Sequence, residues 1–248
     1  PPPPAVVRQG NTAILHYFEE LEKQGMDYLY EAKMLIIGSG GVGKTSLRTK
    51  LIDISAPLPR EEATTRGIEI EQLTIHAAED RELTVNIWDF GGQEIYHATH
   101  QFFLTKRSLY ILLDDTRKDD KTVNDPIFNY WLQMAELYGD QSPLLIVQNE
   151  KGDRSKELDI QGMQGRFGLV KDSKATNLLT CRGLEDVWNS IKYWFHHLPH
   201  VGEEQPKVWL DIRTELERLA KEEQKDYISV EKYYDICSGF GIPERDRA

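Results

Sequence analysis

One stretch of the sequence, Gly38 to Thr45, has the residue types and spacing of a phosphate-binding loop. It reads G-S-G-G-V-G-K-T and lies between an apolar run at 34–38 and a helix-like segment at 45–53. Glycines let such a loop wrap so that its backbone N–H groups point at phosphate oxygens, and the following helix adds its positive N-terminal end. The predicted phosphate ligands are Gly38, Gly40, Gly41, Val42, Gly43, Lys44, Thr45 and Ser46.

Two side chains at the end of this loop bring charge and metal chemistry. We expect the Lys44 ammonium to reach the β- and γ-phosphates and to neutralise charge during phosphoryl transfer. We expect the Thr45 hydroxyl to bind Mg²⁺ directly. The loop therefore predicts a nucleoside triphosphate and Mg²⁺ as ligands.

A second motif, W-D-F-G-G-Q-E at 88–94, ends a strand that should lie in the same sheet as the strand entering the phosphate loop. This position places Asp89 in the outer shell of Mg²⁺ and the Gly92 amide near a γ-phosphate. It also places Gln93 to orient an attacking water. The motif therefore predicts hydrolysis of the γ-phosphate.

The loop threonine Thr65, in A-T-T-R-G-I, completes the predicted catalytic set. Its hydroxyl would bind Mg²⁺ and its N–H the γ-phosphate, in the triphosphate state only, as in switch loops that order with the nucleotide. Thr64 is the alternative for this role. For Arg66 the solvated side chain is favoured over an arginine finger, and for His97 and His100 helix packing is favoured over a general base.

The sequence N-E-K-G-D, which follows an apolar strand, resembles the guanine-reading pattern N-K-x-D but is one residue longer. We interpret Asn149 as bracing the loop, Lys151 as covering the base and Asp153 as accepting hydrogen bonds from the guanine N1–H and N2 amino groups, since a carboxylate has two acceptors. Glu150 stands where the pattern has lysine and Gly152 where it has aspartate, so this alignment lengthens the loop by one residue. The alternative is that the base site is lost.

A last loop, T-C-R-G-L at 180–184, follows the final predicted strand. We expect the Cys181 N–H to contact the guanine carbonyl oxygen. A nucleophilic role for Cys181 has no supporting base in the sequence.

These motifs need a sheet to bring them together, and the apolar patterns predict one. Strands are predicted at 34–38, 68–76, 83–89, 108–115, 143–148 and 177–180, and helices at 45–53, 124–138, 159–165 and 183–198. The alternation indicates an α/β fold with a doubly wound, six-stranded, mostly parallel sheet and helices on both faces. A hairpin adds one antiparallel edge strand, and a change of phase near Glu71 predicts a bulge or twist in it.

The remaining segments flank this sheet. Residues 1–31 predict an amphipathic lead-in helix or linker, and residues 32–198 the nucleotide-binding domain. The composition of 199–206 predicts a linker. Residues 207–248 predict helices that are too few for a secure core, so we expect them to dock on the nucleotide-binding domain or on a second copy of the chain. The opening prolines and missing initiator methionine indicate a piece of a longer protein.

Composition limits the possible partners. The 248 residues carry a net charge of −11, which argues against nucleic acid and anionic membranes as main partners. The two distant cysteines, Cys181 and Cys237, favour a reducing, cytoplasmic setting over a disulfide framework. The apolar runs are too short for a transmembrane segment.

Four segments together resemble the Roc domain, the Ras-like P-loop GTPase of Roco proteins: GSGGVGKTSL, TTRGIEI, WDFGGQEIYHATHQFFLT and VQNEKGDR. The resemblance covers about 32–198. Residues 207–248 resemble the beginning of the COR domain through VWLDIRTELERL, YISVEKYYDIC and GFGIP. The departure from the family pattern is Glu150 and Gly152 in the base-reading loop.

The resemblance implies a guanine-nucleotide switch that uses Mg²⁺ and hydrolyses GTP slowly to GDP and phosphate. It also implies leucine-rich repeats upstream and a full-length protein that forms a homodimer through the COR region. Two alternatives remain open at this point. One is a nearly inert nucleotide-binding scaffold or dimerisation module, and the other is an ATPase with a lost guanine site.

Overall fold

The computed structural model describes residues 2, 4–59, 67–76, 81–91, 103–116, 126–151, 158–224 and 227–242. The chain divides into two compact units. One unit is Tyr30–Val201, and the other combines Pro1–Leu29 with Gly202–Ala248.

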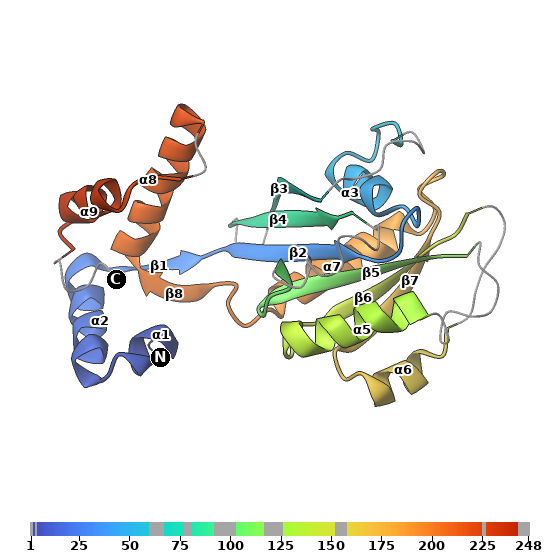
Figure 1. Ribbon diagram of the computed structural model, residues 1–248, viewed down its shortest axis with the longest axis horizontal. Helices are drawn as coiled ribbons and strands as arrows, with labels where there is room; N and C mark the ends of the chain where they lie inside the picture. The colour runs from blue at the N-terminus through green and yellow to red at the C-terminus, as the bar shows by residue number, and fades with distance from the viewer. Residues whose placement is uncertain are drawn as a thin grey trace. The chain divides into compact units, whose positions relative to one another are not determined.

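The Tyr30–Val201 unit is built on a six-stranded sheet with the order β3-β4-β2-β5-β6-β7 (Figure 1). Its strands are β2 (Glu31–Ile37), β3 (Ile68–His76), β4 (Glu82–Phe90), β5 (Ser108–Asp115), β6 (Leu144–Asn149) and β7 (Val170–Thr176). Only β3 runs antiparallel to its neighbour, and it lies at an edge. The predicted α/β class, with a mostly parallel six-stranded sheet and one antiparallel edge strand, is confirmed.

Helices cover both faces of this sheet. The helices α3 (Lys44–Ile52) and α7 (Leu184–His196) contribute Leu47 and Ile191 to the apolar core on one face. The helices α5 (Pro126–Gly139) and α6 (Ile160–Arg166) contribute Trp131 and Met163 to the core on the other face.

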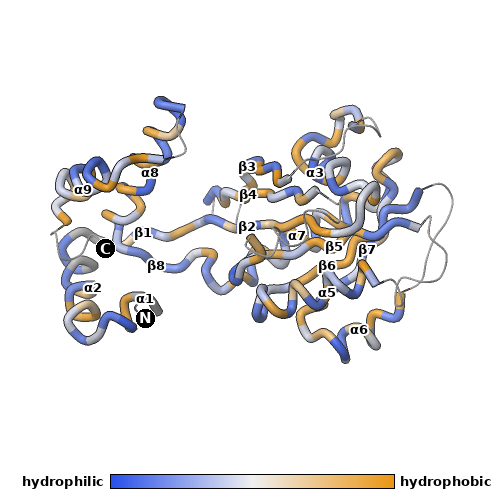
Figure 2. Tube along the Cα trace, viewed as in Figure 1, coloured by the Kyte–Doolittle hydropathy of each residue, from blue (hydrophilic) through white to orange (hydrophobic). Residues whose placement is uncertain are grey.

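The central strands are apolar because both of their faces are covered. Every residue of β6 is buried, and β5 is buried except at Asp114. Figure 2 shows that β5 and β6 are hydrophobic along most of their length, whereas β7 is mostly hydrophilic. The central strands therefore gave clear apolar signals, and the edge strand β7 did not.

The predicted final strand at 177–180 is wrong. The strand that pairs with β6 is Val170–Thr176, and residues 177–180 form the turn after it. Leu178 is buried beneath this turn, whereas Leu179 is 78% exposed. The two adjacent leucines produced an apolar pattern like that of a buried strand. The actual strand, β7, is polar because it lies at the edge of the sheet.

The predicted bulge near Glu71 is also absent. The pairing of β3 with β4 keeps one register from Ile68 opposite Phe90 to His76 opposite Glu82. The apolar residues change face instead, since Ile68 packs on one core and Leu73 on the other. Ile70 shares the face of Ile68 but is 52% exposed.

The second unit combines the two ends of the chain. Its elements are α1 (Pro4–Arg8), α2 (Asn11–Gln24), β1 (Met26–Leu29), β8 (Glu203–Pro206), α8 (Lys207–Glu223) and α9 (Val230–Gly239). The strands β1 and β8 form an antiparallel ribbon. The linker expected at 199–206 therefore ends in a strand, because its last residues find hydrogen-bonding partners in the lead-in segment.

The predicted helices after residue 207 are confirmed, and within this unit they pack on each other and on the lead-in segment. Val208, Ile212 and Cys237 share a small buried core. The rings of Tyr17 on α2 and Trp209 on α8 lie 5.9 Å apart. Among the helices that the structure describes, none has the length and apolarity needed to cross a membrane.

Candidate functional site

The candidate site lies where the carboxyl ends of the parallel strands meet. Ile36 of β2 is in register with Asp89 of β4, and Asp115 of β5 is in register with Asn149 of β6. Open α/β sheets bind ligands at this edge because the loops that follow the strands converge there. The sheet therefore brings the predicted phosphate loop, metal ligand and base-reading loop together.

The glycines of the phosphate loop are required by close packing at two positions. Gly38 has φ 139°, and a Cβ there would lie 2.4 Å from the Leu113 carbonyl oxygen. Gly43 has φ 105°, and a Cβ there would lie 2.6 Å from Asn149 Nδ2. At both positions, the clash of an added Cβ with its neighbour and the positive φ exclude residues other than glycine.

Lys44 is the first residue of α3, and its ammonium lies within the loop. Lys44 Nζ donates to the carbonyl oxygens of Gly38 at 3.0 Å and Ser39 at 2.8 Å. Burial lowers the Lys44 pKa to about 8, and the nearby Asp89 carboxylate partly opposes this effect. The loop thus holds a desolvated cation, which favours a bound anion.

Thr45 and Asp89 bring two hard oxygen ligands together beside this cation. Thr45 Oγ1 donates to Asp89 Oδ2 at 2.7 Å, and Asp89 is fully buried. Burial raises the Asp89 pKa, while the Thr45 hydrogen bond and the cations of Arg48 and Lys44 oppose the rise. A hydroxyl and a carboxylate at a phosphate loop fit Mg²⁺, which takes few protein ligands and completes its shell with phosphate and water.

Arg48 is a buried part of this site that the sequence analysis missed. Its Nη1 lies 2.6 Å from Glu69 Oε2 and 3.8 Å from Asp89 Oδ2, and its Nε lies 3.2 Å from Glu71 Oε2. Arg48 thus joins α3 to β3 and to the metal-ligand candidate. The available signal was its place four residues after Lys44, which puts both cations on one face of the helix.

The base-reading side of the site is tied to the phosphate loop by Asn149. Its Nδ2 donates to the Val42 carbonyl oxygen at 2.9 Å, and the Leu178 N–H approaches its Oδ1 at 3.5 Å. Asn149 therefore ties the end of β6 to the phosphate loop.

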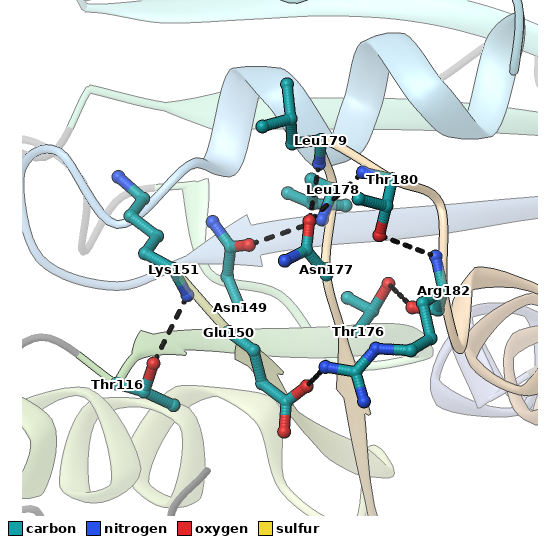
Figure 3. Close-up of polar contacts among 10 residues, drawn as sticks. All are labelled: Thr116, Asn149, Glu150, Lys151, Thr176, Asn177, Leu178, Leu179, Thr180 and Arg182. Carbon is teal, nitrogen blue, oxygen red and sulfur yellow. Dashed lines mark hydrogen bonds and ion pairs between the residues drawn. The ribbon is translucent and has the colours of Figure 1, made fainter. Parts of the chain in front are cut away.

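Lys151 also reaches the phosphate loop. Its Nζ donates to the Gly41 carbonyl oxygen at 2.8 Å, and its N–H donates to Thr116 Oγ1 at 3.2 Å. Figure 3 shows the contact of Lys151 with Thr116 and the neighbouring contacts among the loops after β6 and β7. Lys151, which stands one residue later than the lysine of the usual pattern, thus contacts the predicted phosphate loop.

Cys181 lies in the turn after β7. It is half-buried with φ 60°, and its carbonyl oxygen accepts from the Leu184 N–H at 3.2 Å. The turn is stabilised by Asn177 Oδ1, which accepts the N–H groups of Leu179 and Thr180 at 3.0 Å each.

Several predicted residues lie outside the described part of the chain. They are Thr64, Thr65, Arg66, Gly92, Gln93, His97, His100, Gly152 and Asp153. Their roles remain predictions from the sequence.

Comparison with known proteins identifies a family. Residues 33–152 match the family model "Ras of Complex, Roc, domain of DAPkinase". The chain is 34% identical over 250 residues to a Roc-COR-CHAT protease of Runella zeae, which covers 92% of this chain and 26% of that protein. It is 28% identical over 251 residues to the probable serine/threonine-protein kinase pats1 of Dictyostelium discoideum, covering 92% of this chain and 8% of that protein.

A solved structure of a Roco protein also matches this chain. The Roco2 RocCORdC protein of Methanosarcina barkeri, bound to GDP, superposes with a TM-score of 0.72 at 36% identity. The match covers 86% of this chain and 62% of that chain. The chain thus spans only part of these relatives. Residues 33–152 match the Roc domain, and over most of its length the chain is similar to Roc-COR proteins of the Roco family.

Proposed function

We propose that this chain is the nucleotide switch of a Roco protein, which binds GTP with Mg²⁺ and hydrolyses it slowly to GDP and phosphate. The observation that carries the proposal is the arrangement of Lys44, Thr45 and Asp89 at one loop, to which Asn149 and Lys151 are also bonded. This arrangement joins a phosphate site, a metal-ligand pair and a base-side brace.

In this proposal the chain acts mainly by positioning and by charge. Lys44 exchanges its loop carbonyl contacts for the β- and γ-phosphates, and the loop N–H groups hold the phosphate oxygens. Thr45 would bind Mg²⁺ directly, Asp89 would hold it through water, and the Thr65 hydroxyl would join in the triphosphate state. The bound ion would neutralise charge on the phosphates. Thr65 and Gly92 contact the γ-phosphate, and Gln93 orients the water that attacks it.

The guanine base would lie between Lys151 and the turn that contains Cys181. Asp153 would accept the guanine N1–H and N2 amino groups, and the Cys181 N–H would donate to the guanine oxygen. Support comes from Lys151, which contacts Gly41 although it is displaced by one residue from the usual pattern. The same displacement by one residue would bring Asp153 to the position of the guanine-reading carboxylate.

We further propose the domain arrangement: a lead-in at 1–31, the Roc domain at 32–198, a connection at 199–206 and the beginning of COR at 207–248. The whole protein would carry leucine-rich repeats upstream and would form a homodimer through its COR region. Its place of action would be the cytoplasm.

Single-turnover hydrolysis tests the catalytic part of this proposal. With excess protein, Gln93→Leu should slow γ-phosphate cleavage by at least about tenfold because the attacking water loses its positioning group. The exposed Gln164 of α6 offers a control, and Gln164→Leu should leave the rate unchanged.

The same experiment separates the alternatives. Binding of GTP without cleavage by the wild type would favour a scaffold. Preferential cleavage of ATP would favour an ATPase with a lost guanine site.

A further inference from the structure

The loops after β6 and β7 leave the sheet side by side, and they are joined by a pair of charged residues. Asn149 ends β6 opposite Thr176, which ends β7. The Glu150 N–H then donates to the Thr176 carbonyl oxygen at 2.7 Å. The strand pairing therefore continues through Glu150, which stands where the usual base-reading pattern has lysine.

Glu150 and Lys151 point in opposite directions (Figure 3). Lys151 extends toward the phosphate loop, where it contacts Gly41. The Glu150 carboxylate points toward the turn after β7, where it pairs with the Arg182 guanidinium. Glu150 thus binds the neighbouring loop and leaves the approach to the phosphate loop to Lys151.

The two partners differ in exposure. The Glu150 side chain is only 10% exposed, whereas that of Arg182 is 68% exposed. A mostly buried carboxylate depends on a cation for compensation, and Arg182 supplies this charge from the solvent side. The pair therefore contributes more than two fully exposed side chains would.

The backbone of Arg182 is held at the same place. Its carbonyl oxygen accepts from Thr176 Oγ1 at 3.0 Å and from the Asn177 N–H at 2.9 Å. Cys181, whose N–H is proposed to contact the base, is the adjacent residue. The ion pair thus anchors the residue next to that N–H.

We propose that Glu150 and Arg182 form a latch that holds the base-contacting turn closed and so sets how long a guanine nucleotide stays bound. The inference rests on the proposed function, because the latch acts on a base bound between the two loops. The two side chains act through Cys181 and Lys151 and are positioning residues. Their loss should affect nucleotide release and not the cleavage step.

The test is a double-mutant cycle on the release of fluorescently labelled GDP from the full chain. Glu150→Gln and Arg182→Gln should each accelerate release about three- to tenfold, as expected when a partly buried ion pair is broken. The double variant should be no faster than the faster single variant, because the interaction is already lost. The exposed Arg213–Glu217 pair of α8 supplies a control, and Arg213→Gln should leave release unchanged.

Three further readouts exclude a general structural effect. Arg182→Lys, which keeps the charge, should restore at least part of the slow release. In Arg182→Gln the single-turnover rate of GTP cleavage should match the wild type, and circular dichroism without nucleotide should show that the chain remains folded. Since Arg182 is largely exposed, this variant tests the latch even if Glu150→Gln does not fold.

The possible outcomes distinguish a failure of the latch proposal from a failure of the proposed nucleotide-binding function. A wild-type chain that binds no GDP would overturn both proposals. A wild type that binds GDP while the variants release it at the wild-type rate would overturn the latch alone. Faster release from Arg182→Gln but not from a folded Glu150→Gln would also overturn the latch, because Arg182 would then act on the nucleotide without its partner.

Discussion

At the scale of single residues, the proposed site depends on three cations with defined partners, two of which are buried. Lys44 contacts loop carbonyl oxygens, Arg48 lies among carboxylates and Lys151 reaches Gly41. The whole chain is strongly acidic, with a net charge of −11. Phosphate recognition must therefore come from these local cations and the loop N–H groups.

Replacing Lys44 by alanine should remove most of the affinity for GTP. A charge-assisted hydrogen bond contributes about 1.5–3 kcal/mol, so affinity should fall roughly tenfold to a hundredfold. Titration calorimetry measures the loss. Unchanged affinity would contradict the phosphate-loop assignment.

The lowered pKa of Lys44 predicts a pH dependence of binding. Because its pKa lies at about 8 instead of 10.5, the ammonium is present below pH 8 and is lost as the pH rises above it. Phosphate favours the protonated form, so GDP affinity should be nearly constant between about pH 7 and 8, where the phosphate stays ionised, and should decrease above pH 8.

Two variants identify the group responsible for this decrease. Burial also lowers the Lys33 pKa to about 8, but its Nζ contacts Phe103 and Thr105 instead of the loop. In Lys33→Met, GDP affinity should still decrease above pH 8. In Lys44→Arg, the GDP binding that remains should lack the part of this decrease that comes from deprotonation of Lys44. Ionisation of the base affects all variants equally. An identical pH profile in Lys44→Arg would contradict the assignment.

Gly43 provides a test of the loop geometry. Alanine there would take a left-handed conformation and clash with Asn149 Nδ2, at a cost of about 1–2 kcal/mol or more. We expect Gly43→Ala to weaken GDP binding at least about tenfold as the brace moves. Gly165 of α6 has open space around its Cα, so Gly165→Ala should bind GDP like the wild type. Equal affinities of the two variants would be inconsistent with the described loop.

At the scale of elements, sequence patterns predicted best where burial is symmetrical. The strands β5 and β6 are covered on both faces and produced continuous apolar runs. The edge strand β7 has a polar pattern, and the adjacent Leu178 and Leu179 misplaced it by several residues. An edge strand such as β7 is defined by its hydrogen bonds to the neighbouring strand. A hydrophobicity pattern does not reveal those bonds.

The same limit applies to the candidate site. Local motifs predicted Lys44, Thr45 and Asn149 because each role follows from neighbours along the chain. The Arg48–Glu69 and Glu150–Arg182 pairs join residues from different elements. Such pairs depend on how strands and helices meet, and one sequence without its fold does not specify them.

The helix α8 allows a test of the second unit. Ile212 is buried in the small core that also contains Cys237, so Ile212→Ala should lower the stability of this unit by about 2–4 kcal/mol. Thr214 on the same helix is exposed, and Thr214→Ala should change stability by less than about 0.5 kcal/mol. Thermal unfolding followed by circular dichroism makes the comparison. Equal midpoints for the two variants would contradict the described packing.

At the scale of the whole molecule, the chain pairs a nucleotide-binding unit with a unit built from both of its ends. The unit built from both ends contains the β1–β8 ribbon, which pairs residues that precede the Roc domain in the sequence with residues that follow it. The relatives of this chain are much longer than the chain, which spans 26% of the Runella protein. The activity of the longer protein is therefore proposed from the site within the Roc domain.

The most direct test of the central claim is a calorimetric titration of the purified, nucleotide-free chain with GDP in the presence of Mg²⁺, beside an identical titration with ADP. We expect GDP to bind at one site per chain, ADP to bind at least about a hundredfold more weakly, and Lys44→Ala to lose most of the GDP affinity. The hundredfold preference would follow from base contacts that adenine does not satisfy. Equal binding of the two nucleotides, or no GDP binding by the folded wild-type chain, would contradict the assignment of a guanine-nucleotide switch.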